Sequence, residues 1–242
     1  ADTTFYGKGL SYVHEAEKQI QMLSSVCRRV ESPRHISQLA DSFQAVVSDM
    51  FTGRPQPGAI EIPIDLQYAN TKKVAIELPS DNIFEADPSV ISRVADKIKE
   101  ASKRIFVVGG GVISSEATQE LCELAEQLDA PVLTTVDGRG VLPEDHRLCM
   151  GNYYNSAGIY SAIQDADLTI AIGTKFAVGV DGQFHEQTPP GELIQIDIDG
   201  NMIGRTHKAA IGVLSDAKSA LNQLKPLLSD LSQNAVSYTH LT

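Results

Sequence analysis

Hydrophobic positions in the C-terminal two thirds of the chain fall into short unbroken runs that alternate with amphipathic stretches. In the amphipathic stretches apolar residues recur every three or four positions, which predicts helices at 89–101, 116–128, 158–164 and 217–231. The unbroken runs predict strands at 105–108, 131–135, 168–172, 193–198 and 211–214. Strands without polar alternation are typical of a parallel sheet that is covered on both faces. The pattern therefore predicts one doubly wound α/β domain over residues 88–232.

The first third of the chain carries fewer elements. Helices are expected at 15–25 and 33–51, and a strand is expected at 59–62, where Pro63 ends it. These elements are too few to close a two-layer core. Residues 1–72 are therefore predicted to be the C-terminal part of a second α/β domain, with exposed apolar surface over residues 1–67. Residues 73–87 are predicted to be a linker, and residues 233–242 a non-native tail; both ends are expected to be truncations.

Charge and cysteine content narrow the class of partner. The chain has 20 Lys and Arg against 31 Asp and Glu, a net charge of −11, which disfavours nucleic acid and anionic membranes. No apolar run is long enough to cross a bilayer. The three cysteines lie far apart in the sequence. They predict free thiols in a reducing cytoplasm and no metal site.

Candidate chemistry lies directly after the predicted strands, because ligands of such sheets bind at the carboxyl ends of the strands. A Gly-Gly-Gly turn follows the first strand, and it predicts either a cradle for a phosphate or a tight turn. Asp199 predicts either an acceptor for ribose hydroxyls or a turn aspartate. Together the strand ends predict a crevice suited to an adenine nucleotide. Its candidate residues are Gly109, Gly110, Gly111, Thr135, Gly158, Gly173, Lys175, Phe176, Asp197 and Asp199.

The sequence lacks a self-sufficient catalytic group. There is no nucleophile-elbow motif and no Walker A motif. His146 is expected in a polar turn, Cys122 is expected in the core, and Glu61 is expected to be a solvated strand residue.

Several segments, taken in order, resemble one family. Residues 53–65, Gly-Arg-Pro-Gln-Pro-Gly-Ala-Ile-Glu-Ile-Pro-Ile-Asp, resemble the segment that closes the pyrimidine-binding domain of thiamine-diphosphate enzymes. Residues 107–111, 130–135 and 138–146 resemble the opening half of that family's central domain, and residues 166–176 and 196–205 resemble its closing half. The large subunit of acetolactate synthase is the most similar type.

The resemblance implies decarboxylation and carboligation of 2-oxoacids such as pyruvate through a cofactor enamine, as in branched-chain amino acid biosynthesis. It implies thiamine diphosphate and Mg²⁺ in the full-length enzyme, which would be a homodimer or homotetramer. The family's activating glutamate would precede residue 1, and its Gly-Asp-Gly…Asn motif would follow residue 232. The fragment itself is therefore expected to be inactive. His14 and Glu15 are expected to be neighbours of the active site.

The occupant of the central domain stays open between FAD, another nucleotide and none. Two departures from the synthases bear on this choice. Residues 151–158 stand in place of their Gly-Met-x-Gly-Met-His-Gly segment. Lys175 stands in place of their arginine after the third strand, and lysine lacks arginine's planar guanidinium. A benzoylformate decarboxylase-like enzyme is an alternative. A nucleotide- or NAD-binding Rossmann domain without this chemistry is another, although Ser114 replaces the third glycine of the dinucleotide motif.

Overall fold

The computed structural model describes residues 2–10, 12, 16–77, 84–152, 157–177 and 188–231. The chain divides into two compact units, residues 1–82 and residues 83–242. His14, Glu15 and the predicted tail at 233–242 lie outside the described residues, as does part of the predicted linker. No helix among the described residues is both long enough and apolar enough to cross a membrane.

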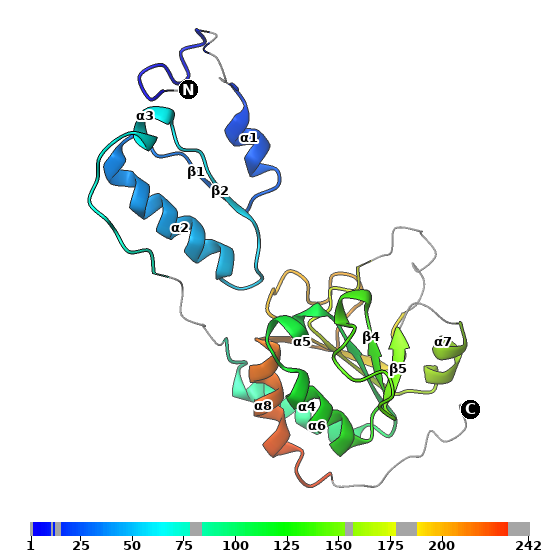
Figure 1. Ribbon diagram of the computed structural model, residues 1–242. Helices are drawn as coiled ribbons and strands as arrows, with labels where there is room; N and C mark the ends of the chain where they lie inside the picture. The colour runs from blue at the N-terminus through cyan, green and yellow to red at the C-terminus, as the bar shows by residue number, and fades with distance from the viewer. Residues whose placement is uncertain are drawn as a thin grey trace. The chain divides into compact units, whose positions relative to one another are not determined.

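The first unit is a helix packed on a pair of parallel strands (Figure 1). Gly58 begins the second strand, and a Cβ there would lie 2.6 Å from Cγ1 of Val46, so the absent side chain lets the helix approach closely. The predicted helix at 33–51 begins later than expected, because His35 caps a short 3₁₀ turn that precedes it. The elements are α1 (Gln19–Ser24), β1 (Arg29–Glu31), η1 (Ile36–Gln38), α2 (Leu39–Phe51), β2 (Gly58–Ile60) and α3 (Ile64–Gln67).

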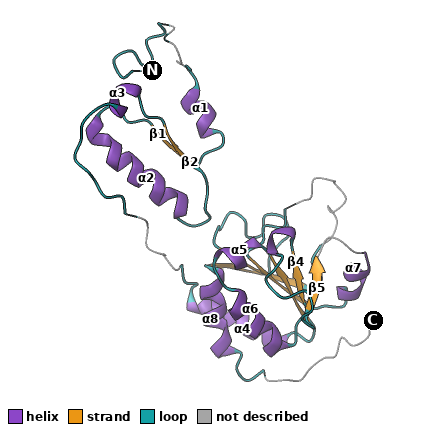
Figure 2. Ribbon diagram, in the orientation of Figure 1, coloured by secondary structure: helices purple, strands orange, loops and turns teal. Residues whose placement is uncertain are grey.

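The second unit contains a six-stranded parallel sheet with the strand order β5-β4-β3-β6-β7-β8. Figure 2 shows the sheet in orange, with β4 and β5 labelled. The predicted α/β class is confirmed. The strands are β3 (Arg104–Val108), β4 (Val132–Thr134), β5 (Cys149–Asn152), β6 (Leu168–Ile172), β7 (Glu192–Asp197) and β8 (Ile211–Leu214). The helices are α4 (Pro88–Glu100), α5 (Gly110–Ser114), α6 (Thr118–Leu128), η2 (Val136–Gly138), α7 (Ala157–Ile163) and α8 (Ala217–Leu227).

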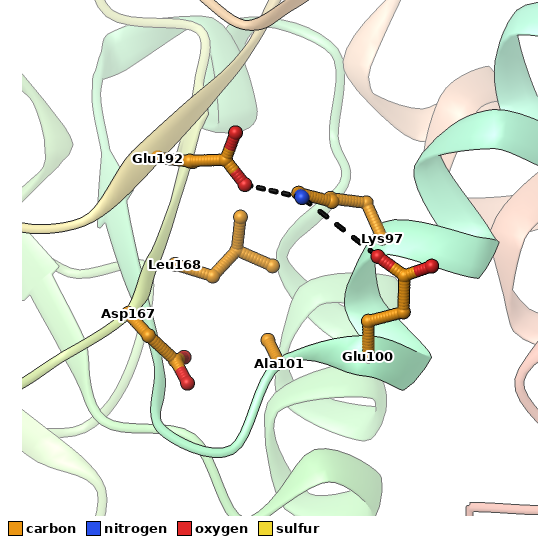
Figure 3. A pocket seen from close by; sticks show the side chains of 6 residues that line it. All are labelled: Lys97, Glu100, Ala101, Asp167, Leu168 and Glu192. Atoms are coloured by element: carbon orange, nitrogen blue, oxygen red, sulfur yellow. Dashed lines mark ion pairs between the residues drawn. The ribbon is translucent and has the colours of Figure 1, made fainter.

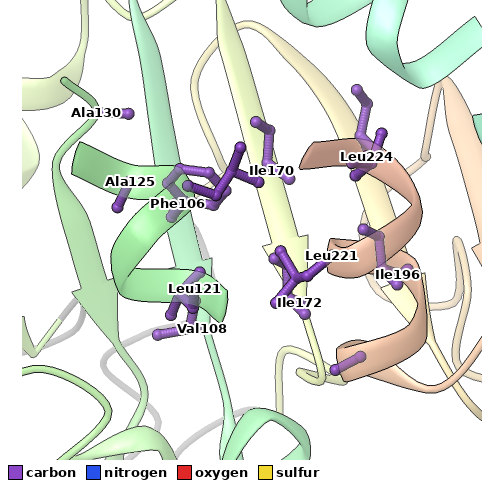
Figure 4. Packing of buried hydrophobic residues seen from close by; sticks show 14 of the residues in the cluster. Phe106, Val108, Leu121, Ala125, Ala130, Ile170, Ile172, Ile196, Leu221 and Leu224 are labelled. Carbon is purple, nitrogen blue, oxygen red and sulfur yellow. The ribbon is translucent and has the colours of Figure 1, made fainter. Parts of the chain in front are cut away.

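The larger core lies between α4, α6 and α8 and one face of the sheet. Figure 4 shows Leu121 of α6 and Leu221 of α8 directed at β3 and β6, where Phe106 and Ile170 are almost fully buried. Alternate residues of the same strands enter a second cluster on the opposite face, together with Ile163 of α7. This two-sided burial explains the unbroken apolar runs of the sequence.

The strand order reverses between β3 and β6. These two strands are hydrogen-bonded neighbours, with Val108 paired with Ile172, although six described elements separate them along the chain. Such a reversal is where ligands of open α/β sheets bind, outside the carboxyl ends of the strands. The fold thus directs attention to the residues that follow Val108 and Ile172.

Candidate nucleotide site

The candidate residues that follow β3, β4, β6 and β7 lie at one edge of the sheet, because these strands are parallel and adjacent. Thr135 follows β4 and is half-buried, and Lys175 follows β6 and is exposed. Gly158 is exposed near the start of α7. The structure therefore places these candidate residues near the carboxyl ends of the strands, and their individual contacts differ.

The Gly-Gly-Gly turn packs against backbone and does not present a phosphate cradle at its two outer glycines. A Cβ on Gly109 would lie 2.3 Å from the carbonyl oxygen of Gly173, and one on Gly111 would lie 2.6 Å from the Cα of Gly173. The Gly109 amide donates to the carbonyl of Ile172 (3.0 Å), and the Gly111 amide donates to that of Gly173 (3.1 Å). These N–H groups are already used. The observation favours the tight-turn interpretation for both residues.

The loop after β6 combines an exposed cation with a buried ring. Phe176 is 2% exposed and belongs to the second hydrophobic cluster, so its ring is a core group. The ring meets His207 edge to face, with centroids 4.9 Å apart. Burial lowers the pKa of His207 below its usual value. Of the neighbours Lys175 and Phe176, only Lys175 therefore faces the solvent.

The two aspartates after β7 form consecutive side-chain turns. Asp197 is 7% exposed, and its Oδ1 accepts the amide of Asp199 (2.9 Å). Oδ1 of Asp199 in turn accepts the amide of Asn201 (3.0 Å). The half-buried Asp199 is thus a turn aspartate whose carboxylate still lies at the carboxyl edge.

Sequence reasoning missed Gln195, the one amide in the apolar run of β7. Its side chain is 1% exposed and fully engaged with the loops that follow β6 and β7. The available signal was one amide within residues 193–196, which are otherwise apolar, since a buried polar group needs partners.

The prediction that Cys122 lies in the core needs correction. Cys122, within α6, is half-buried, and its Sγ lies 4.0 Å from Nε2 of His146. Oε1 of Glu126, one helical turn after Cys122, lies 3.2 Å from the same nitrogen. His146 does lie in a turn, as expected, because its amide donates to the carbonyl of Pro143 (3.0 Å).

Cys122, Glu126 and His146 bring three metal-ligating atoms within 4.8 Å of one another. The hydrogen bonds oppose coordination. Nδ1 of His146 accepts the amide of Leu148 (3.2 Å), so the proton of the neutral ring is on Nε2 and points to Glu126. Burial is the main cause that raises the pKa of the Cys122 thiol, and Glu126 adds to it. A neutral thiol beside a protonated nitrogen is not a prepared metal site.

Glu61 is not the solvated residue that was expected. Its side chain is 13% exposed and pairs with Arg34 (Oε2 to Nη2, 3.4 Å), while its Oε2 accepts the Ser32 hydroxyl (2.6 Å). The Arg34 guanidinium lies over the ring of Tyr6. These groups hold the segments that follow β1 and β2 in the first unit.

The opposite, amino edge of the sheet has a pocket of about 150 Å³ (Figure 3). Lys97 lies there between Glu192, with which it forms an ion pair, and Glu100 (3.7 Å). The Asp167 carboxylate accepts the amides of Ser102 (2.8 Å) and Lys103 (2.9 Å). Each of these charged side chains in the pocket thus has a partner within the protein. We therefore interpret the pocket as a structural feature at the amino ends of the strands.

Comparison with known proteins connects the fold to a family. Residues 91–224 match the model of the thiamine pyrophosphate enzyme central domain. The chain is 33% identical over 196 residues to a probable acetolactate synthase large subunit of Methanocaldococcus jannaschii, covering 77% of this chain and 33% of that protein. It is 35% identical over 202 residues to the acetolactate synthase large subunit of Corynebacterium glutamicum, covering 81% and 32%.

Two further relatives extend the comparison. A glyoxylate carboligase of Escherichia coli O157:H7 is 30% identical over 199 residues, which are 76% of this chain and 32% of that protein. The crystal structure of benzoylformate decarboxylase from Polynucleobacter necessarius shares the fold, with a TM-score of 0.77 at 22% identity over 96% of this chain and 43% of that one. The chain spans about a third of the length of these curated relatives. From the match of its second unit, the chain belongs to the thiamine pyrophosphate enzymes, of which it carries the central domain.

Proposed function

We propose that the chain is part of a thiamine-diphosphate-dependent enzyme that acts on 2-oxoacids such as pyruvate, in the manner of an acetolactate synthase. The observation that carries this proposal is 33–35% identity to two acetolactate synthase large subunits over about 200 residues. The cofactor, when bound, supplies the electron sink for decarboxylation. A cytoplasmic homodimer or homotetramer is part of the proposal, supported by the three free cysteines and the family.

The described residues do not fit the diphosphate and Mg²⁺ of that cofactor. Magnesium takes oxygen ligands. The one group of metal-ligating side chains within mutual reach among them is the sulfur-containing set of Cys122, Glu126 and His146. We therefore expect no turnover from this chain alone.

A direct test joins the chain to the flanking sequence of its source gene. The extended protein, supplied with thiamine diphosphate and Mg²⁺, is expected to release carbon dioxide from pyruvate and to form acetolactate. The 242-residue chain under the same conditions is the control, with no product expected. Absence of turnover by the extended protein with pyruvate and with other 2-oxoacids would contradict the proposal.

We further propose that the carboxyl edge of the six-stranded sheet binds an adenine nucleotide, with FAD as the first ligand to test. The residues suit its ribose and phosphates: Thr135 offers a hydroxyl, Lys175 a cation and Asp199 a carboxylate. Calorimetric titration with FAD, ADP and NAD would test this, with FAD or ADP expected to bind. Tight binding of NAD, without binding of FAD or ADP, would favour an NAD-dependent enzyme instead.

A further inference from the structure

A buried glutamine connects the two loops that follow β6 and β7. Nε2 of Gln195 donates to the carbonyl oxygens of Thr174 (3.1 Å) and Met202 (3.2 Å). Its Oε1 accepts the amide of Gly204 (2.8 Å). Both donors and the acceptor of the side chain are thus used on loop backbone. This one side chain therefore joins the two loops through three hydrogen bonds.

The loop after β6 has an unusual backbone that needs such support. Gly173 and Phe176 have φ values of 59° and 50°. The left-handed region is rare for a bulky residue such as phenylalanine, and it persists where surrounding contacts enforce it. Backbone strain of this kind recurs at ligand sites, which connects the loop after β6 with ligand binding.

Three more contacts hold the same loop. The Thr174 hydroxyl accepts the amide of Phe176 (3.2 Å), and the Thr206 hydroxyl donates to the carbonyl of Lys175 (3.1 Å). The ring of Phe176 packs edge to face on His207. None of these contacts uses the Lys175 side chain, which is exposed. The lysine is therefore presented by a loop whose backbone is held from the interior.

We propose that Gln195 is a positioning residue for the nucleotide site: it sets the separation of Lys175, on one loop, from Asp199, on the other, and does not touch the ligand. The inference rests on the proposed nucleotide binding. An apolar residue would satisfy the core equally well, because Gln195 lies beside Ala171 in the register of β6 and β7, on the face of the second hydrophobic cluster. The hydrogen bonds to the two loops therefore explain why a glutamine, and not an apolar residue, stands at this position.

The test compares Gln195→Met with Thr169→Val. Methionine keeps the length of the side chain and removes the three hydrogen bonds. Thr169 is a matched control, since it is fully buried on the neighbouring strand and donates to the carbonyl of Pro190 (2.7 Å), away from the carboxyl edge. Both variants are expected to melt at lower temperature. Titration with FAD and ADP, well below either melting temperature, should show about tenfold weaker binding for Gln195→Met and little change for Thr169→Val.

A second variant gives a readout that lost stability would not produce. In Gln195→Glu an ionised carboxylate cannot donate to either carbonyl, whereas the protonated acid can donate to one. Burial raises the pKa of such a carboxyl group. Relative to the original chain at each pH, affinity should therefore be lower at pH 8 than at pH 6. This measurement also stands alone if Gln195→Met does not fold.

The outcomes separate the two proposals. If the original chain binds FAD or ADP and the two variants Gln195→Met and Thr169→Val lose affinity equally, Gln195 serves stability only and this inference is wrong, while nucleotide binding stands. An affinity of Gln195→Glu that does not depend on pH relative to the original chain also counts against it. If the original chain binds neither nucleotide, the proposed nucleotide site fails and the inference fails with it.

Discussion

Gly111 and Gly173 meet where the strand order reverses, so the space that a side chain would need is occupied by backbone. A Cβ on Gly111 would lie 2.6 Å from the Cα of Gly173, and its nearest neighbours are all backbone atoms of Gly173, which limits relaxation. We expect Gly111→Ala to destabilise the second unit by about 1–3 kcal/mol, the usual cost of overpacking. Gly200→Ala is the matched control, because its nearest neighbour would be Leu214 Cδ1 at 3.7 Å. Denaturant unfolding of both variants measures the difference, and equal stabilities would refute the close contact.

A second prediction at this scale concerns pH. Burial lowers the pKa of His207 in the folded protein below the usual value of about 6.5. Below that value the unfolded chain takes up a proton that the folded chain resists, so His207 reduces stability as pH falls from 7 toward the folded pKa. His207→Leu keeps an apolar contact for Phe176 and should flatten this part of the pH profile. Thermal unfolding at pH 7 and pH 5 tests it; an unchanged slope would assign the pH dependence to other groups.

Single residues were predictable only where their role is set by neighbours in sequence. The placement of Lys175 and Asp199 followed from strand order alone, and the structure agrees. Cys122 was predicted to be in the core, since helical spacing cannot show that His146, 24 residues later, lies beside it. Glu61 was missed for the same reason, because its partner Arg34 comes from a different strand end.

At the scale of elements, length and side-chain type decided what could be predicted. β6 and β8 have the bounds that the apolar runs predicted. β5 was missed because its sequence, Cys-Met-Gly-Asn, has no β-branched run, and β1 was missed because it has three residues, two of which are charged. The helix expected at 116–128 is preceded by the separate α5, which begins at Gly110, in the turn for which a phosphate cradle and a tight turn were both considered. Tertiary pairing creates these elements, and local pattern alone does not reveal them.

The start of α4 offers a prediction for an element. Oδ1 of Asp87 accepts the amide of Ser89 (2.8 Å) and its hydroxyl (2.7 Å), and these hydrogen bonds hold the pKa of Asp87 below its usual value. The ionised carboxylate therefore stabilises the fold above the ordinary carboxyl pKa, and this contribution is lost as pH falls through the lowered value. Asp87→Ala should lower the melting temperature at pH 7 and change it less at pH 3. Asp96→Ala, an exposed site within the same helix, is the control and should have little effect at either pH.

At the scale of the whole molecule, the two units differ in how much apolar surface they bury. Almost all of the buried hydrophobic residues belong to the second unit, whereas Val46 and Leu66 are the buried hydrophobic residues among those described in the first. Met22 and Val26, in the first unit, are 63% and 69% exposed. This exposure confirms the apolar surface that the sequence predicted for residues 1–67. No residue of α1 is fully buried, and Ile20 and Leu23 are half-buried, so its apolar face is only partly covered within this unit.

The last prediction uses that contrast. A dye that fluoresces on apolar surfaces should bind the complete chain, because monomeric proteins rarely leave large apolar patches uncovered. A shorter chain of residues 84–231 retains the six-stranded sheet and the two clusters that cover it, and it should fold, as circular dichroism and a cooperative melt would show. Its dye binding should be largely abolished. Fluorescence that persists at equal molar concentration would place the dye on the second unit, where Ile113 and Val136 are also exposed. Ile113→Ser in the complete chain separates these cases, since it should leave most of the signal if the first unit is the source.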